Sequence, residues 1–147
     1  MDYRAATPTD LAKVFSHIAE RVTQEYQAAG LTEQSVQDEL HMNLREGRAH
    51  TILEKGEPVA VIAWHETDNA AVTTFAADES FFTAPSVRFA KRHIRRIQAL
   101  CGNVPIYFQS RSQRTDVSKW FRIIGFSQTE ARNGAVIFVL EPMVQNS

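Results

Sequence analysis

Two pairs of ionisable residues directly follow predicted strands, where their side chains could reach a cleft. His65 and Glu66 come at the end of one apolar strand, and Asp78 and Glu79 come at the end of the next. A histidine or carboxylate in such a position can take a proton from a reacting group, so both pairs are candidates for general-base chemistry. The alternative for each pair is ordinary polarity at a strand end or turn.

The other reactive side chains show no partner at a useful spacing in the sequence. The five histidines have no metal-ligand spacing with the cysteine or with glutamates, so no metal site is predicted. Cys101 is the only cysteine, which excludes an internal disulfide and fits a reducing compartment. Its place late in a predicted helix indicates a small buried core residue rather than a nucleophile.

A dense set of positive charges lies on one face of a long helix, which is predicted to start at Thr83–Ser86 and to end near Leu100. Such a cluster can neutralise phosphates regardless of sequence, so this basic face could bind a polyanion. An ordinary solvated surface is the alternative. The basic face comprises Arg88, Lys91, Arg92, Arg95 and Arg96, opposite a core stripe of Val87, Ala90, Ile94, Ile97 and Cys101.

Composition and charge describe one domain with two unlike halves. The chain has 147 residues, of which 44% are hydrophobic, and we expect a single domain over residues 1–147. It shows no apolar run of membrane length and no signal peptide, so we expect a cytoplasmic protein with no membrane partner. Residues 1–80 hold 14 Asp and Glu against 6 Lys and Arg, whereas residues 81–147 hold 3 against 10. This asymmetry indicates a polyanion site, a charged partner or mutual packing of the halves, and two solvated faces are the alternative.

Periodicity and turn signals predict the elements that position these residues. A first strand is followed by two helices, with candidate caps at Thr9 for the first and at Thr32 or Ser35 for the second. Three mostly apolar strands come next, then the basic helix, a strand, a helix and two final strands. The order is therefore β-α-α-β-β-β-α-β-α-β-β, which implies a mixed α/β sheet. The predicted strands include Tyr3–Ala6, Ala49–Glu54, Pro58–His65, Ala70–Ala77 and Val104–Phe108, and the first helix runs to Ala28.

The C-terminal segment carries the most specific pattern in the chain. Residues 119–124 read as an amphipathic helix, and Gly125 suits the left-handed position that follows a helix. Phe126 begins a strand, and a hairpin-type turn at Arg132–Gly134 precedes a final apolar strand. This ending resembles the C-terminal part of the GCN5-related N-acetyltransferase (GNAT) superfamily, whose members transfer acyl groups from acyl-coenzyme A.

The predicted element order is also that of the GNAT fold, so the resemblance implies a GNAT-like mixed central sheet. Residues 4–11 and 56–60 are similar to common GNAT openings. One departure concerns proton donation. The family helix usually carries a Tyr four residues before its Gly, and this chain has Phe121 there, which cannot protonate a leaving thiolate.

The resemblance implies acetyl-coenzyme A as the cofactor. The backbone of Phe75, Ala76 and Ala77 would pair with the pantetheine arm, and a loop at a helix N-terminus would hold the phosphates. The family loop has the pattern Gln/Arg-x-x-Gly-x-Gly/Ala, whereas residues 79–88 contain no glycine. The implied phosphate ligands are Ser80, Thr83, Ser86 and Arg88, and the residue that would act on an amine through water is His65, Glu66 or Glu79.

A narrower likeness covers residues 85–130, which resemble GNAT-like proteins of short-tailed bacteriophages, some of them internal virion or virion-assembly proteins. It implies a viral protein in an infected bacterial cytoplasm that engages a host or virion partner. Two functions follow. The first is a degenerate acetyltransferase that acts as a binding or assembly protein, and the second is an active N-acetyltransferase, because a fold does not fix a function.

Overall fold

The computed structural model describes residues 1–111, 114–132 and 134–144. In this part of the chain, seven strands form one mixed sheet in the order β1-β2-β3-β4-β5-β7-β6. All neighbouring strands are antiparallel except β4 and β5. The predicted mixed α/β fold is therefore confirmed. The strands are β1 (Asp2–Ala5), β2 (Ala49–Glu54), β3 (Glu57–Glu66), β4 (Ala71–Ala77), β5 (Ile106–Ser110), β6 (Ser127–Arg132) and β7 (Ala135–Leu140).

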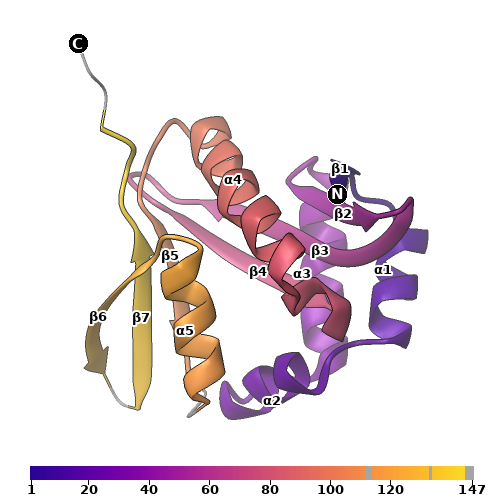
Figure 1. The fold of residues 1–147 in the computed structure, drawn as a ribbon, viewed down its shortest axis with the longest axis horizontal. Coiled ribbons are helices and arrows are strands. Elements are labelled where there is room, and N and C mark those ends of the chain that lie inside the picture. The colour runs from indigo at the N-terminus through magenta and orange to yellow at the C-terminus, as the bar shows by residue number, and fades with distance from the viewer. Residues whose placement is uncertain (112–113, 133, 145–147) are drawn as a thin grey trace.

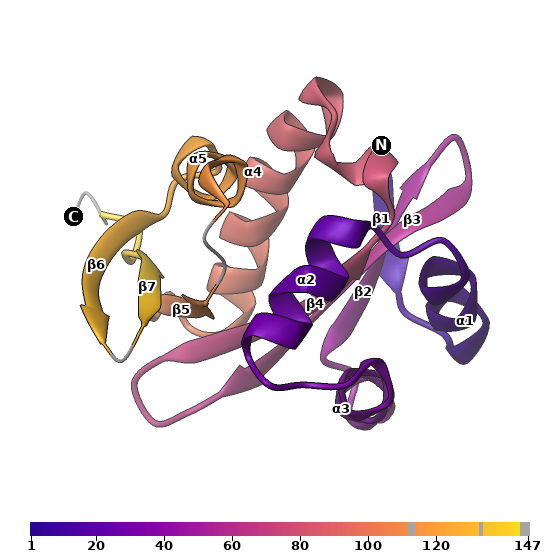
Figure 2. The same ribbon diagram turned by 90° about the horizontal axis from the view of Figure 1, so that it is seen from below.

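The helices cover both faces of the sheet (Figures 1 and 2). On one face, Asp10 accepts a hydrogen bond from Thr51 of β2, and Glu39 accepts one from Thr74 of β4. On the other face, the ring of Phe75 stacks on Trp120. This separation follows the two-residue period of the strands. The first face carries α1 (Pro8–Ser16), α2 (Glu20–Ala28) and α3 (Glu33–Arg45), and the second carries α4 (Ala84–Leu100) and α5 (Thr115–Ile123).

The first predicted helix is in fact two helices, which corrects the predicted order at this point. The helical spacing of apolar residues continues through residues 17–19, but the backbone there leaves the helix. Ile18 forms an isolated antiparallel bridge with Asp78, and the amide of Ala19 donates to the carbonyl of Ala77 at 2.8 Å. A contact with the end of β4 thus outweighs the local helical pattern, because tertiary context overrides propensity.

Several other helix boundaries lie close to those predicted from local sequence signals. Thr32, one of the two predicted candidates, caps α3, and the structure adds a reciprocal capping box with Ser35. Thr7 rather than Thr9 caps α1, because its hydroxyl accepts from the amide of Asp10. Gly125 follows α5 with a φ of 112°, which confirms its left-handed role. The predicted turn at Arg132–Gly134 includes Asn133, which lies outside the described residues.

Two features that would indicate membrane insertion or metal binding are absent from the described residues. Within the described ranges, no helix is both long and apolar enough to cross a membrane. Over the same ranges, no group of three or more His, Cys, Asp or Glu side chains is placed to hold a metal ion.

Candidate functional site at the gap between β4 and β5

The two parallel strands at the centre of the sheet separate after a short contact. They pair only at Ala71 with Ile106 and at Val72 with Tyr107, and then diverge. We call the opening beyond these pairs the β4–β5 gap. Backbone groups alternate in direction along a strand, and the amide of Ala71 points toward β5, where it donates to the Pro105 carbonyl at 2.9 Å. The backbone groups of Phe75 and Ala77, an even number of residues further on, therefore face the gap.

The carbonyl groups of both residues accept hydrogen bonds from α2 or from the residue before it. The hydroxyl of Tyr26 donates to the carbonyl oxygen of Phe75 at 2.5 Å, and the amide of Ala19 donates to that of Ala77. Burial, with a smaller contribution from Glu33, raises the pKa of Tyr26 above its ordinary value, so the phenol keeps its proton and remains a donor. The protein itself thus supplies the partners for two acceptors of β4 that face the gap.

Ion pairs fasten the start of α2 to both sides of the gap. Arg21 pairs with Glu79 beyond β4 and with Asp116 at the start of α5, the latter at 3.6 Å. Its guanidinium also lies over the ring of Phe82, 4.4 Å from the ring centroid. A hydrogen bond from Arg114, with a further contribution from Arg21, lowers the pKa of Asp116, so this carboxylate stays charged. Glu79, a predicted base, is therefore engaged in an ion pair.

A buried carboxylate fastens the middle of α2 to β5. Glu25 is 9% exposed and accepts hydrogen bonds from the Ser110 hydroxyl at 2.9 Å and from the Arg111 amide at 3.0 Å. These two donors lie at the end of β5, on the far side of the gap from Tyr26's partner Phe75. Helix α2 therefore bridges the open end of the gap, as Figure 2 shows.

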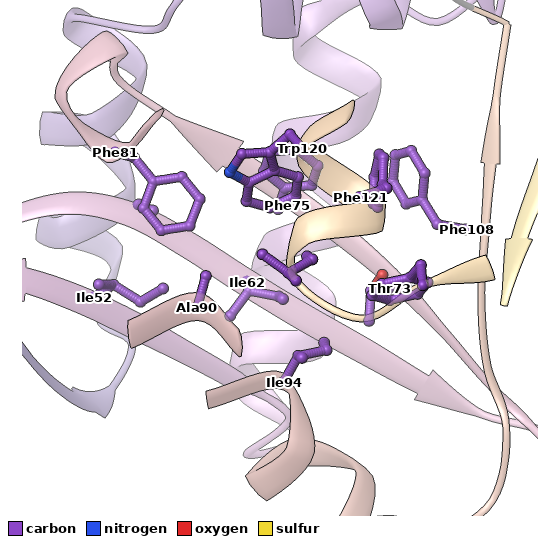
Figure 3. Close-up of a pocket in the computed structure, with 13 residues that line it drawn as sticks. Ile52, Ile62, Thr73, Phe75, Phe81, Ala90, Ile94, Phe108, Trp120 and Phe121 are labelled. Atoms are coloured by element: carbon purple, nitrogen blue, oxygen red, sulfur yellow. The ribbon is translucent and has the colours of Figure 1, made fainter. Parts of the chain in front are cut away.

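Aromatic side chains fill the gap on the face covered by α4 and α5 (Figure 3). Trp120 stacks on Phe75 with ring centroids 6.1 Å apart, and Phe108 packs on Phe121 at 4.6 Å. A cavity of about 30 Å³ remains on this face, and one of about 20 Å³ remains between these rings and α2. The indole nitrogen of Trp120 is buried and, among the described residues, has no hydrogen-bond partner. We call this set the aromatic cluster: Phe75, Phe81, Phe82, Phe108, Trp120 and Phe121.

The loop before α4 satisfies its own polar groups. It contains a 3-10 turn, η1 (Glu79–Phe82), and the carboxylate of Asp78 accepts both the amide of Ser80, at 2.9 Å, and the hydroxyl of Ser80. The hydroxyls of Thr83 and Ser86 lie 3.2 Å apart, and Ser86 is fully buried. Of the predicted phosphate ligands, Arg88 is exposed and the other three are engaged within this loop. The carboxylate of Asp78 thus caps η1, whereas the N-terminus of α4 at Thr83 has no side-chain cap.

The predicted bases lie at opposite ends of the sheet. His65 pairs with Val72 near the β3–β4 hairpin, and Glu66 follows it, whereas Glu79 lies beyond the other end of β4. The seven residues of β4 correspond to roughly 20 Å of strand. Antiparallel pairing of β3 and β4 is the physical reason that these residues cannot serve one centre.

Glu66 instead lies near the thiol of the lone cysteine. Burial, followed by the charge of Glu66 and a hydrogen bond to it, raises the pKa of Cys101 to about 11. A thiol with this pKa stays protonated near neutral pH and is a poor nucleophile. This agrees with the expectation of a core residue.

The basic face of α4 is partly used in packing. Arg95 donates to Gln98 and to the backbone carbonyl of Glu141, both at 2.7 Å. Arg96 donates to the hydroxyl of Tyr3 at 3.0 Å. Arg95 is half-buried, whereas Arg88, Lys91, Arg92 and Arg96 remain exposed on this face.

A buried histidine pair under α4 was missed by the sequence analysis. Nδ1 of His50 lies 2.9 Å from Nε2 of His93, whose side chain is 4% exposed, and the ring of Tyr3 packs on both. Burial, then the charges of His50 and Arg96, lowers the pKa of His93 to about 3. Burial also lowers the pKa of His50. Both rings are therefore neutral near pH 7, and their only sequence signal was a histidine within the apolar stripe of α4.

A larger cavity lies where α2 and α3 cover the gap and was also missed. It measures about 150 Å³ and lies between α2, α3, β4 and β5. The hydroxyl of Thr74 donates to the carboxylate of Glu39 across it at 3.3 Å. We call it the α2–α3 pocket. Its lining comprises Val22, Glu25, Tyr26, Ala29, Leu31, Val36, Glu39, Val72, Thr73, Thr74, Phe75, Phe108 and Gln109.

Comparison with known proteins identifies the architecture. No family model matches the sequence, and no curated protein matches it. Among solved structures, the PaiA N-acetyltransferase of Thermoplasma acidophilum in complex with coenzyme A has a TM-score of 0.72 at 11% identity, over 97% of this chain and 98% of that chain. Aminoglycoside 6′-acetyltransferase type Ii gives 0.68 at 10% identity over the full length of both chains. The GNAT domain of S. lividans PAT gives 0.70 at 12% identity over 93% and 88%. The chain therefore has the fold of the GNAT acetyltransferases.

Proposed function

We propose that this chain is a GNAT-fold binding protein that has lost the use of acyl-coenzyme A. The observation that carries this proposal is the filling of the β4–β5 gap by the protein itself. The carbonyl groups of Phe75 and Ala77 are bonded to α2 and to the residue before it, and the aromatic cluster leaves only small cavities beside them. A pantetheine arm would have to displace these contacts before it could pair with β4.

The loop before α4 supports the same proposal. Phosphate groups bind at helix N-termini through unpaired amides and a favourable dipole. Here Asp78 holds the amide of Ser80 in η1, and Glu79, which is paired with Arg21, adds a second carboxylate before α4. Carboxylates beside the start of a helix disfavour the binding of a pyrophosphate. The residues present therefore do not fit coenzyme A.

A second candidate is an active N-acetyltransferase, and one observation favours it. The amides of Phe75 and Ala77 face the gap together with their carbonyl groups, so part of the backbone edge that the fold offers to a pantetheine arm is retained. The fold likeness extends over nearly the whole chain to a structure that contains coenzyme A. This candidate requires α2 to move away from the gap.

The partner in the proposed binding role is a macromolecule. The resemblance to bacteriophage proteins implies a host or virion protein, and the exposed cations of α4 offer a surface for a polyanion. Elution of the protein from heparin over a salt gradient tests the second idea, because counterion release makes such binding fall steeply with salt. Passage through heparin at low salt would contradict it.

Calorimetric titration with acetyl-coenzyme A separates the two candidate functions. We expect no saturable binding up to about millimolar ligand. A dissociation constant of that size corresponds to a binding free energy of roughly 4 kcal/mol. Micromolar binding by the parent protein, with thiol release in the presence of amines, would overturn the proposal.

A matched pair of variants shows which feature excludes the coenzyme. Asp78→Asn removes a carboxylate from the loop and keeps a good capping residue, whereas Asp68→Asn makes the same change in the distant β3–β4 turn. We expect neither variant to bind, because the gap stays filled in both. Binding by Asp78→Asn alone would assign the exclusion to charge repulsion instead.

A further inference from the structure

We infer that the outer surface of α4 and α5 binds the phosphodiester backbone of a double-stranded nucleic acid, without reading its sequence. This inference rests on the proposed function in one respect, because it names the polyanion that the exposed cations of α4 would meet. Figures 1 and 2 show α4 and α5 next to each other on one face of the sheet. The surface is thus the outer side of two helices and involves neither the gap nor a cavity.

Cations far outnumber anions on these two helices. Their residues include seven Lys and Arg against one acidic residue, Asp116, which is paired with Arg21 and Arg114. In the described part of the chain, none of the exposed cations of α4 and α5 forms an ion pair with a carboxylate. Their charges are therefore left for a partner to neutralise. These exposed cations are Arg88, Lys91, Arg92, Arg96, Lys119 and Arg122.

The helices on the other face of the sheet carry the opposite charge. Helices α1, α2 and α3 include six Asp and Glu against three Lys and Arg. A polyanion is attracted to one side of such a molecule and repelled from the other, which orients its approach. The charge difference between the two halves of the sequence thus becomes a difference between two faces, and the partner is expected to meet α4 and α5 alone.

The cations of α4 form a row along the helix. Arg88, Arg92 and Arg96 recur every four residues, so they follow one side of the helix at intervals of about 6 Å. The row is about 12 Å long and corresponds to roughly four phosphates, since each strand of a duplex carries one charge per about 3.4 Å of axis. Lys119 and Arg122, three residues apart on α5, add charge beside this row.

The aromatic residues of these helices are engaged in packing. Phe89 stacks on the ring of His93. Trp120 stacks on Phe75, and Phe121 is buried. Proteins that bind single strands stack the bases on aromatic side chains, which this surface does not offer. A duplex keeps its bases stacked on one another and presents its phosphates, so the surface favours a duplex.

The surface also lacks the apolar centre of a typical protein interface. Such interfaces surround buried aromatic and aliphatic anchors with a polar rim. The exposed large apolar residues of α4 and α5 are Leu100 and Ile123, and each is the last residue of its helix. The cations therefore lie on a polar surface, which fits a phosphate backbone better than an acidic protein.

Fluorescence anisotropy with labelled nucleic acids tests the inference. Duplex DNA or duplex RNA should bind at low salt, with equal affinity for two unrelated sequences of the same length. If about four phosphates are neutralised, the affinity should fall roughly hundredfold between about 50 and 200 mM salt. Binding of either duplex supports the inference, and the two affinities show which backbone is preferred. Tighter binding of single-stranded oligo-dT, or equally tight binding of polyglutamate, would overturn it.

A pair of arginine variants supplies the control. Arg92 lies in the middle of the row and forms no ion pair with a described carboxylate, so Arg92→Gln should leave the fold intact. It is expected to weaken duplex binding severalfold and to reduce the slope of log affinity against log salt by about one. Arg45→Gln removes the same charge from the exposed end of α3, on the opposite face, and should bind as the parent does. Equal weakening in both variants would reduce the effect to net charge and overturn the surface.

Acetyl-coenzyme A as a competitor separates this inference from the proposed function. Duplex binding that the coenzyme does not displace, with no binding of the coenzyme itself, supports both. Duplex binding together with coenzyme binding and acetyl transfer keeps the surface and overturns the proposed function. Absence of duplex binding, with the coenzyme also unbound, overturns the surface and leaves the proposed function with a protein partner.

Discussion

The two faces of the sheet at the β4–β5 gap are filled in different ways. On the α4 and α5 face, aromatic rings from four elements meet and leave only a small cavity (Figure 3). On the α2 and α3 face, a pocket of about 150 Å³ remains between the helices and the strand. The β4–β5 gap is therefore filled on one face of the sheet and open on the other.

Alternation along β4 explains much of this difference. Phe75 points toward α5, whereas Val72 and Thr74 point toward α2 and α3. Helix α5 adds Trp120 and Phe121 to the first face, and α3 adds the carboxylate of Glu39 to the second. Large apolar groups pack against one another on the first face, and smaller or polar groups leave space on the second. The difference shows that the alternation of side chains along one strand can fill one face of a gap and leave space on the other.

The largest expected effect is on the packed face. Phe121→Ala removes a ring that is 4% exposed within the aromatic cluster, and should lower the free energy of unfolding by about 3–5 kcal/mol. Leu31→Ala at the edge of the α2–α3 pocket should cost about 1 kcal/mol or less, because Leu31 is already 45% exposed. Urea unfolding of both variants measures the contrast. Similar losses in the two would show that the faces are packed alike.

The stability of the packed face is also expected to depend on pH, because His93 is buried there. The pKa of His93 is lowered from 6.5 to about 3, so the unfolded chain binds more protons than the folded one below pH 6.5. Stability is therefore full above about pH 6.5 and falls progressively toward pH 3. Unfolding measured between about pH 7 and 5, above most carboxylate pKa values, should show this fall.

Histidine variants test the assignment of that fall. His93→Gln should remove most of the slope, whereas His17→Gln, at an exposed position, should retain it. A slope that is unchanged in His93→Gln would place the titrating group elsewhere.

The smallest effect is expected at the junction of the two faces. Tyr26→Phe removes the hydrogen bond to the Phe75 carbonyl and should cost about 1 kcal/mol, the usual net value of one hydrogen bond. The variant keeps the ring in the α2–α3 pocket, so the packing there should change little. Thermal unfolding measures the cost. A gain of acetyl-coenzyme A binding in this variant would show that the hydroxyl alone closes the gap.

The sequence predicted those parts of the fold whose signals are local. The capping box of Thr32, the long amphipathic α4 and the glycine after α5 each depend on neighbouring residues, and the structure has all three. The break at residues 17–19 was not predictable in this way. It depends on a bond to Ala77, which is distant in sequence, and it interrupts a regular helical pattern.

The site was less predictable than the fold, for a related reason. His65 and Glu79 looked equivalent because each follows a strand, but antiparallel pairing sends them to opposite ends of the sheet. The α2–α3 pocket joins Glu39 on a helix with Thr74 on a strand, two residues that no motif links. Alternation in β4 and the acidic first half of the chain were the only signals that pointed toward it.

The bond between Ala19 and Ala77 has a consequence for how this protein can vary. It joins two backbone groups, so side-chain replacements along α2 leave it in place. The length of the segment at residues 17–19 keeps this bond in register, and inserted residues would release it while the side-chain contacts of Arg21, Glu25 and Tyr26 remain. Reopening the gap by protein engineering would therefore need an insertion in this connection as well as replacement of those side chains.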